Sequence, residues 1–170
     1  MMKYIGLTAL CLSLSLTGAY FSYAHKRKLG ILRALSDFFN EFSSVSSLLS
    51  LDIAGAIERM NSGGKFSSLS FLPLISENFS YGCNIKDLWI NSVSNSREIN
   101  FLDVPSKDLL LSFSEAFGKH SKEDFFSKCS EYSSYFKKYA LKEEEKWDKN
   151  RTLISMSGVL AAAMVFLILI

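Results

Sequence analysis

The chain has 170 residues and a nearly balanced charge, with 19 Lys and Arg against 17 Asp and Glu and a formal net charge of +2. This length allows one domain with a hydrophobic core but not a typical multidomain enzyme. The weak net charge excludes the strong bulk field of many nucleic-acid-binding proteins. With only two prolines and nine glycines, a β-sandwich or turn-rich barrel is disfavoured.

Each end of the chain carries a long segment without charged residues. These segments cover residues 4–23 and 152–170. As a helix, each is long enough to cross a hydrocarbon layer of about 30 Å. We therefore expect two transmembrane helices, 4–23 and 152–170, flanking a central domain of residues 24–151.

The first segment also has the features of a signal peptide. Lys3 precedes it, and Ser22-Tyr23-Ala24 resembles a cleavage site with small residues at its first and third positions. The basic cluster His25-Lys26-Arg27-Lys28 follows at once, and such a cluster opposes translocation. This argument favours an uncleaved anchor, with cleavage as the alternative.

Basic residues gather at both ends of the central domain. Lys26, Arg27 and Lys28 lie at its start, and Lys146, Lys149 and Arg151 lie at its end, whereas Lys3 is the only basic residue outside it. The positive-inside rule then predicts a multi-pass protein of the cell membrane, with residues 24–151 in the cytosol and both termini outside.

The first half of the central domain has helical periodicity. Apolar residues over 27–50 recur at steps of four and three, which predicts a helix with a broad buried face: Ile31, Leu35, Phe38, Phe42, Val45 and Leu49, widened by Leu32 and Phe39. Asn61-Ser62-Gly63-Gly64 indicates a break. Shorter helices are expected over 54–60, over 65–80 with an interruption near Pro73, and over 85–93.

A joint is expected near Gly118. A helix with Pro105 in its first turn extends to about Phe117, and Gly118 then suits the position that requires positive φ. Ser121 and Asp124 have the spacing of a capping box, so Ser121 is expected to cap the next helix. We therefore predict a hinge at Gly118 between two helices.

The last helix is predicted to be long. Phe125, Cys129, Tyr132, Phe136 and Tyr139 form an apolar stripe, and no helix breaker occurs between Ser121 and Gly158. The helix should therefore leave the bundle and enter the second span. The expected fold class is all-α, a helical bundle flanked by an N-terminal and a C-terminal transmembrane helix.

The sequence offers no catalytic or metal-binding pattern. The three cysteines lack CxxC spacing, His25 and His120 stand apart, and Glu143-Glu144-Glu145 suits a solvated helix surface. We expect no enzyme activity, no metal and no cofactor. Small residues four apart, Ser13 with Thr17 and Gly158 with Ala162, suit close helix packing in a membrane, although they are equally compatible with incidental placement.

Four segments in order resemble the stage III sporulation protein AB family of spore-forming bacteria. Leu32-Arg33-Ala34-Leu35 resembles the start of the family's first soluble helix, and Ile85-Lys86-Asp87-Leu88-Trp89 resembles its acidic-x-Trp element. Phe113 to His120 is similar to the family's Phe-x-Glu-x-Leu-Gly-x-His pattern, and Ser157-Gly158 resembles its last-span motif. Ser121 and Phe125 depart from the family's usual Asp and Gln.

The resemblance implies a non-enzymatic adapter in the sporulation channel complex of the mother-cell membrane around the forespore. The family is similar to the cytoplasmic domain of the type II secretion platform protein F. The implied partners are the operon's secretion-type ATPase, other membrane subunits and the lipid bilayer, with no nucleic acid and no small-molecule substrate. An unrelated membrane-anchored regulator or sensor is the alternative, and an enzyme of lipid or envelope chemistry is a further one.

A partner-binding surface is expected near Trp89, Glu115, Lys119 and His120. These residues belong to the family-like segments, and Glu115 and His120 fall off the apolar stripe of Phe113 and Phe117. Trp and charged residues are suitable anchors for a partner protein. The competing interpretation places Trp89 in the core and pairs Glu115 with Lys119 along one helix.

Overall fold

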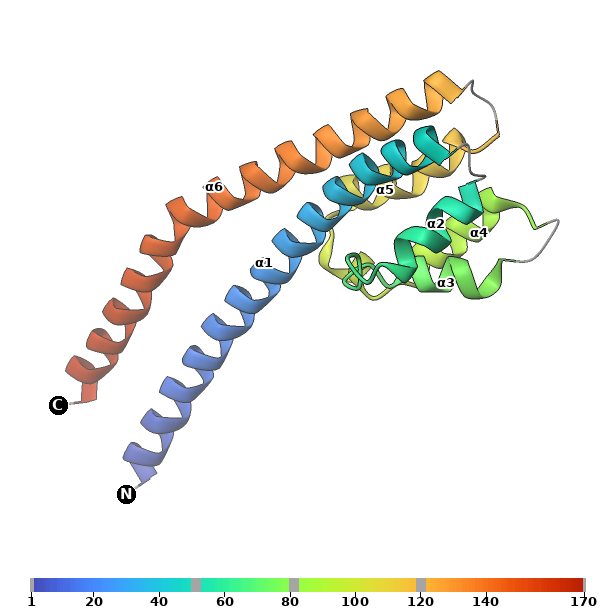
Figure 1. Cartoon of the computed structure of the whole chain (residues 1–170). Helices are drawn as coiled ribbons and strands as arrows, with labels where there is room; N and C mark the ends of the chain where they lie inside the picture. Colours follow the sequence, from blue (N-terminus) through green and yellow to red (C-terminus); the bar gives the residue numbers. More distant parts are fainter. Residues whose placement is uncertain (1, 50–52, 80–82, 119–121, 170) are drawn as a thin grey trace. The chain divides into compact units, whose positions relative to one another are not determined.

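The computed structural model describes the backbone of residues 2–49, 53–79, 83–118 and 122–169. Side chains are described for residues 20–45, 53, 55–79, 83–118 and 123–150. Within these ranges all regular secondary structure is helical (Figure 1). The predicted all-α class is confirmed.

A long helix lies at each end of the described chain, and the short helices come between these two in the sequence. The first, α1, is Met2–Leu49, and the last, α6, is Lys122–Leu169. The short elements follow in chain order: α2 Ile53–Ser62, α3 Phe71–Asn78, α4 Ile85–Ser94, the 3₁₀ helix η1 Glu98–Phe101, α5 Val104–Ser112 and the 3₁₀ helix η2 Phe113–Ala116. The unbroken α6 agrees with the predicted long helix.

The chain divides into two units. Residues 28–140 form one, called here the compact unit, and residues 1–27 with 141–170 form the other, called the terminal unit. The long helices α1 and α6 each contribute to both units. All the short helices belong to the compact unit.

Aromatic side chains fill the core of the compact unit. Trp89 of α4 is fully buried, and its indole packs against the rings of Phe71, Phe113 and Phe117 at centroid distances of 5.2 to 5.4 Å. Phe39 of α1 contacts Phe113 at 4.7 Å. Burying such rings supplies the largest apolar area per residue, so the predicted stripe on α1 is the face that holds the bundle together.

The long helices also pack directly on each other within the compact unit. Phe39 of α1 stacks on Phe136 of α6, with ring planes 4° apart. Next to this pair, the Ser36 hydroxyl donates to the Ser133 carbonyl at 3.0 Å, and the Ser133 hydroxyl donates to the Ser36 carbonyl at 2.9 Å. Small side chains let the two backbones approach, and the reciprocal bonds satisfy both hydroxyls in a partly buried contact.

A buried carboxylate anchors the loop between α4 and α5. Glu98 of η1 is only 4 % exposed, and it accepts hydrogen bonds from the Ser70 hydroxyl at 2.5 Å and the Phe71 backbone N–H at 3.1 Å. Ser70 makes no side-chain cap of its own on α3. Glu98 therefore satisfies a free N–H at the start of α3, where negative charge is favourable.

Two local expectations need correction. The helix beginning near Pro105 does not continue to Phe117, because α5 ends at Ser112 and η2 follows. The tighter turn brings Phe113 and Ala116 onto the same buried side, since residues three apart eclipse in a 3₁₀ helix. Pro73 does not interrupt a helix either, because it lies in the first turn of α3, where its missing N–H costs nothing.

Most side chains of the two predicted transmembrane helices lie outside the described residues. Among the residues that the structure describes, no helix has a stretch long and apolar enough to cross a membrane. The side chains of Ser13, Thr17, Gly158 and Ala162, proposed as packing contacts in those spans, lie outside the described residues.

Gly118 has the backbone expected of a helix-ending residue. Its φ is +97°, in the left-handed region, and it is exposed. Gly30, by contrast, lies inside α1 without positive φ, and a Cβ added at either glycine would have no neighbour within 4 Å. The two positions therefore differ in backbone conformation and not in available space.

The same substitution should have opposite effects at these two glycines. Gly118→Ala should lower the free energy of unfolding by about 1 kcal/mol, because a Cβ is strained at positive φ, and Gly118→Val should lower it further. Gly30→Ala should raise it by up to about 1 kcal/mol, because alanine is the better helix former. Thermal melts of the full chain in detergent provide the measurement. Equal melting of both alanine variants would contradict the assignment of Gly118.

Candidate functional site

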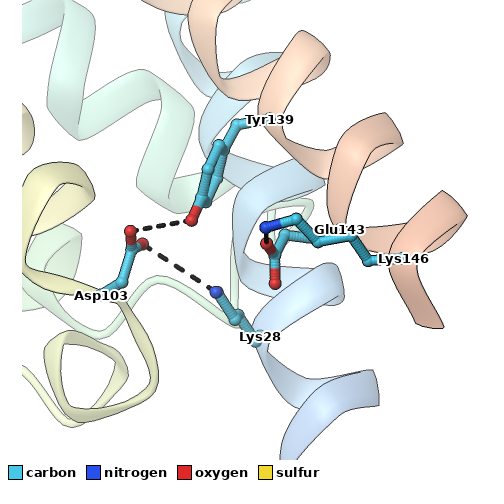
Figure 2. A network of polar contacts seen from close by, with 5 residues as sticks. All are labelled: Lys28, Asp103, Tyr139, Glu143 and Lys146. Carbon is cyan, nitrogen blue, oxygen red and sulfur yellow. Dashed lines mark hydrogen bonds and ion pairs between the residues drawn. The ribbon is translucent and has the colours of Figure 1, made fainter. Parts of the chain in front are cut away.

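A polar network joins three elements of the compact unit (Figure 2). It consists of Lys28 on α1, Asp103, which directly precedes α5, and Tyr139 on α6. The Tyr139 hydroxyl donates to Asp103 Oδ2 at 2.8 Å, and Lys28 Nζ lies 4.0 Å from Asp103 Oδ1. Lys28 Nζ also lies 5.2 Å from the centre of the Tyr139 ring. One carboxylate thus connects both long helices to the start of α5.

The environment of Asp103 favours its charged form. Burial opposes ionisation, but the Ser106 and Tyr139 hydroxyls and the Lys28 charge outweigh it and hold the pKa of the carboxyl below its ordinary value of 3.8. The carboxylate is therefore ionised at neutral pH and attracts Lys28.

The chemistry of this network is structural. The Tyr139 hydroxyl donates a hydrogen bond to the Asp103 carboxylate, and the Lys28 ammonium faces the same carboxylate. Nothing in the three groups activates a nucleophile. Among the described residues, no group of three His, Cys, Asp or Glu side chains could hold a metal ion.

The acidic run on α6 forms local ion pairs in the terminal unit. Glu143 pairs with Lys146 at 3.1 Å, as drawn in Figure 2, and Glu145 pairs with Lys149 at 2.7 Å. Pairs three or four residues apart along an exposed helix contribute only a few tenths of a kcal/mol each. Such pairs fit the solvated helix surface expected for the run Glu143-Glu144-Glu145.

The described cysteines show no reactive pairing. Cys129 is buried on the stripe of α6, and burial raises the pKa of its thiol to about 12. Cys83 is partly exposed, and both thiols are free. Because the thiolate is the reactive form, Cys129 is inert at neutral pH.

The predicted partner surface needs one correction. Trp89 is fully buried, and its indole N–H donates to the Leu110 carbonyl at 2.9 Å, so it cannot be an exposed anchor. Glu115 is exposed on η2. Lys119, His120 and Ser121 lie outside the described residues. Of the four candidates, the described structure leaves Glu115 at the surface.

Sequence reasoning missed the role of Asp103. Its position before Val104 and Pro105 is a helix-start signal, since Asp is favoured at the N-cap and Pro in the first turn. That signal could have identified Asp103 as a structural residue. Its partners could not be found in this way, because Lys28 and Tyr139 lie 75 residues before and 36 residues after it in the chain.

The architecture defines an all-α protein in which two long helices enclose, in sequence, a bundle of short helices around an aromatic core. The family model of stage III sporulation protein AB matches residues 3–170, and the chain belongs to that family. It is therefore a sporulation-related protein. Neither the curated proteins nor the solved structures contain a match to the chain.

The pH dependence of stability should reveal the ionised Asp103. Its folded pKa lies below 3.8, so its contribution is complete above that value and is lost as the pH falls through the folded pKa. At neutral pH, Asp103→Asn should lower the free energy of unfolding by about 1 kcal/mol. The difference from wild type should shrink in acid, as measured by denaturant melts across pH.

Asp108→Asn is the matched control, because Asp108 is an exposed acid on α5, the helix that Asp103 directly precedes. It should stay within about 0.5 kcal/mol of wild type at neutral pH. A difference between wild type and Asp103→Asn that is constant from neutral to acid would contradict the electrostatic role of Asp103.

Proposed function

We propose that the chain is a non-enzymatic membrane adapter of the sporulation channel complex between mother cell and forespore. It tethers the complex's secretion-type ATPase to the membrane and transmits the ATPase's conformational changes to the other membrane subunits. The role extends the family membership and follows the proposed similarity to the type II secretion platform protein F.

The observation that carries the proposal is the match to the family along residues 3–170. It is supported by the continuity of α1 and α6, which each include a predicted span and part of the compact unit. A continuous helix carries displacement along its axis without a loop that absorbs it. An adapter needs this property, whereas an enzyme needs a set of convergent reactive groups.

The proposed membrane arrangement keeps two transmembrane helices, 4–23 and 152–170, with the central domain in the cytosol and both termini outside. The uncharged end segments and the basic residues beside them support it. The ATPase would then meet the exposed surface of the compact unit. Glu115 is the described part of the proposed contact, which includes Lys119 and His120.

Glu115→Ala should reduce recovery of the ATPase without changing the fold. Glu115 is exposed on a short 3₁₀ helix, so its removal creates no cavity. The tagged full chain is recovered from detergent-solubilised sporulating cells, and co-purifying ATPase is quantified. Asp108→Ala, an exposed acid on α5, is the matched control and should recover wild-type amounts. Equal recovery with both variants would remove Glu115 from the contact.

Cysteine labelling should place residue 95 inside the cell. Asn95 is exposed, so Asn95→Cys presents a reachable thiol, while Met2→Cys reports the N-terminus. Cys11 and Cys83 are replaced by serine, and Cys129 is kept, because a buried thiol with a pKa of about 12 does not label.

A membrane-impermeant maleimide should label Met2→Cys on intact cells and Asn95→Cys only after permeabilisation. Labelling of Asn95→Cys on intact cells would overturn the topology. Absence of Met2→Cys from the mature protein would favour cleavage of the first segment.

A further inference from the structure

Three positions within one turn of α1 expose large aromatic side chains. In the terminal unit, Tyr20, Phe21 and Tyr23 are 67 %, 60 % and 57 % exposed. Exposed aromatics grouped this closely are unusual on a surface that only water covers. These aromatic side chains therefore call for an environment other than water around them.

The three side chains share a height along the helix and spread over about 160° of its circumference, with Phe21 about 100° from Tyr20 on one side and Tyr23 about 60° from it on the other. Successive residues turn by about 100° and rise by about 1.5 Å, so residues 20 to 23 lie within about 4.5 Å along the axis. A helix that docks into a protein groove presents a stripe with positions three and four apart. Tyr20 and Tyr23 have that spacing, but Phe21 widens the group to nearly half of the helix circumference within one turn, which fits a planar boundary across the helix.

A fourth aromatic of the terminal unit lies close to this level. Trp147 of α6 stacks on His25, with ring centroids 4.2 Å apart and planes 10° apart. His25 follows Tyr23 by two residues, or about 3 Å along the helix axis. The indole that stacks on His25 therefore lies less than one helical turn beyond Tyr23. Tyr and Trp are the residues enriched where a helix passes from hydrocarbon into the headgroup layer.

Charge changes at the same point of α1. Lys26 and Arg27 are exposed and follow the aromatics directly, with no acidic residue between 20 and 27. Long basic side chains at this height reach lipid phosphates while their aliphatic stems stay near apolar surface. The order of uncharged segment, aromatics and cations follows the order of layers in a bilayer with anionic lipids.

We propose that Tyr20, Phe21, Tyr23 and Trp147 form an interfacial collar in the headgroup region of a bilayer, with Lys26 and Arg27 contacting anionic lipid headgroups. The inference rests on the membrane attachment in the proposed function and adds the depth at which the chain is held and the lipid that it prefers. It requires no partner protein at these residues.

Depth-dependent quenching tests the collar. The full chain is reconstituted in phosphatidylcholine and phosphatidylglycerol vesicles whose acyl chains carry bromine either near the carbonyl or near the methyl end. The chain has two tryptophans, and Trp89 is fully buried in the compact unit. Bromine near the carbonyl should quench wild-type emission more than bromine near the methyl end, and Trp147→Phe should lose this quenching. Stronger quenching by the deep bromine, or no loss in Trp147→Phe, would overturn the proposal.

Lipid preference tests the cations. Enrichment of phosphatidylglycerol over phosphatidylcholine around the protein should fall by up to about fivefold for each of Lys26→Gln and Arg27→Gln. Lys137→Gln, an exposed lysine of the compact unit, is the matched control and should leave enrichment unchanged. An equal fall in all three variants would overturn the role of these cations.

The two proposals fail in different ways. Release of the chain from membranes by alkaline extraction would remove the membrane attachment and with it the adapter function. Retention of the chain with a Trp147 that neither bromine position quenches would mean that protein covers the collar, and would overturn only this inference. Loss of ATPase recovery has no bearing on the quenching result.

Discussion

Burial of the Trp89 indole among phenylalanine rings is the interaction on which the compact unit depends. The indole contacts Phe71 of α3 and the rings of Phe113 and Phe117 around η2, while Phe38 and Phe39 bring α1 to it at 6.3 and 6.4 Å. Short helices of eight to ten residues are unstable alone in water. They persist here because each adds buried apolar side chains to a shared core: rings from α3 and α4, and aliphatic side chains such as Ile57 of α2 and Leu110 of α5. The indole N–H is satisfied by the Leu110 carbonyl.

Polar contacts then fix the positions of the helices that the aromatic core brings together. Glu98 holds the start of α3, the reciprocal Ser36 and Ser133 bonds hold α1 against α6, and Asp103 holds the start of α5 between Lys28 and Tyr139. Each contact joins residues distant in sequence, and each is at least partly removed from water. Breaking one would leave a polar group poorly satisfied, which costs more than the net value of the bond.

The sequence predicted the elements that have a period and missed those that depend on distant contacts. The stripe from Ile31 to Phe42 identified the buried face of α1, and Gly118 has the predicted positive φ, because both signals are local. The family resemblance suggested Trp89 for a partner surface, and a helix as short as α4 carries too few turns for its sequence to show which face is buried. Asp103 and Glu98 escaped notice because only the tertiary fold brings them to Tyr139 and Phe71.

The buried Trp89 changes what the family-like motifs mean. The segment ending in Trp89 and the segment from Phe113 to Gly118 contact each other through Trp89, Phe113 and Phe117, so packing alone accounts for their aromatic residues. The glycine at position 118 is explained by its positive φ. Glu115 is different, because it is exposed between two buried neighbours, Ser114 and Ala116, and no core contact requires a carboxylate there. A test of the proposed ATPase contact should therefore begin at Glu115 and not at the tryptophan.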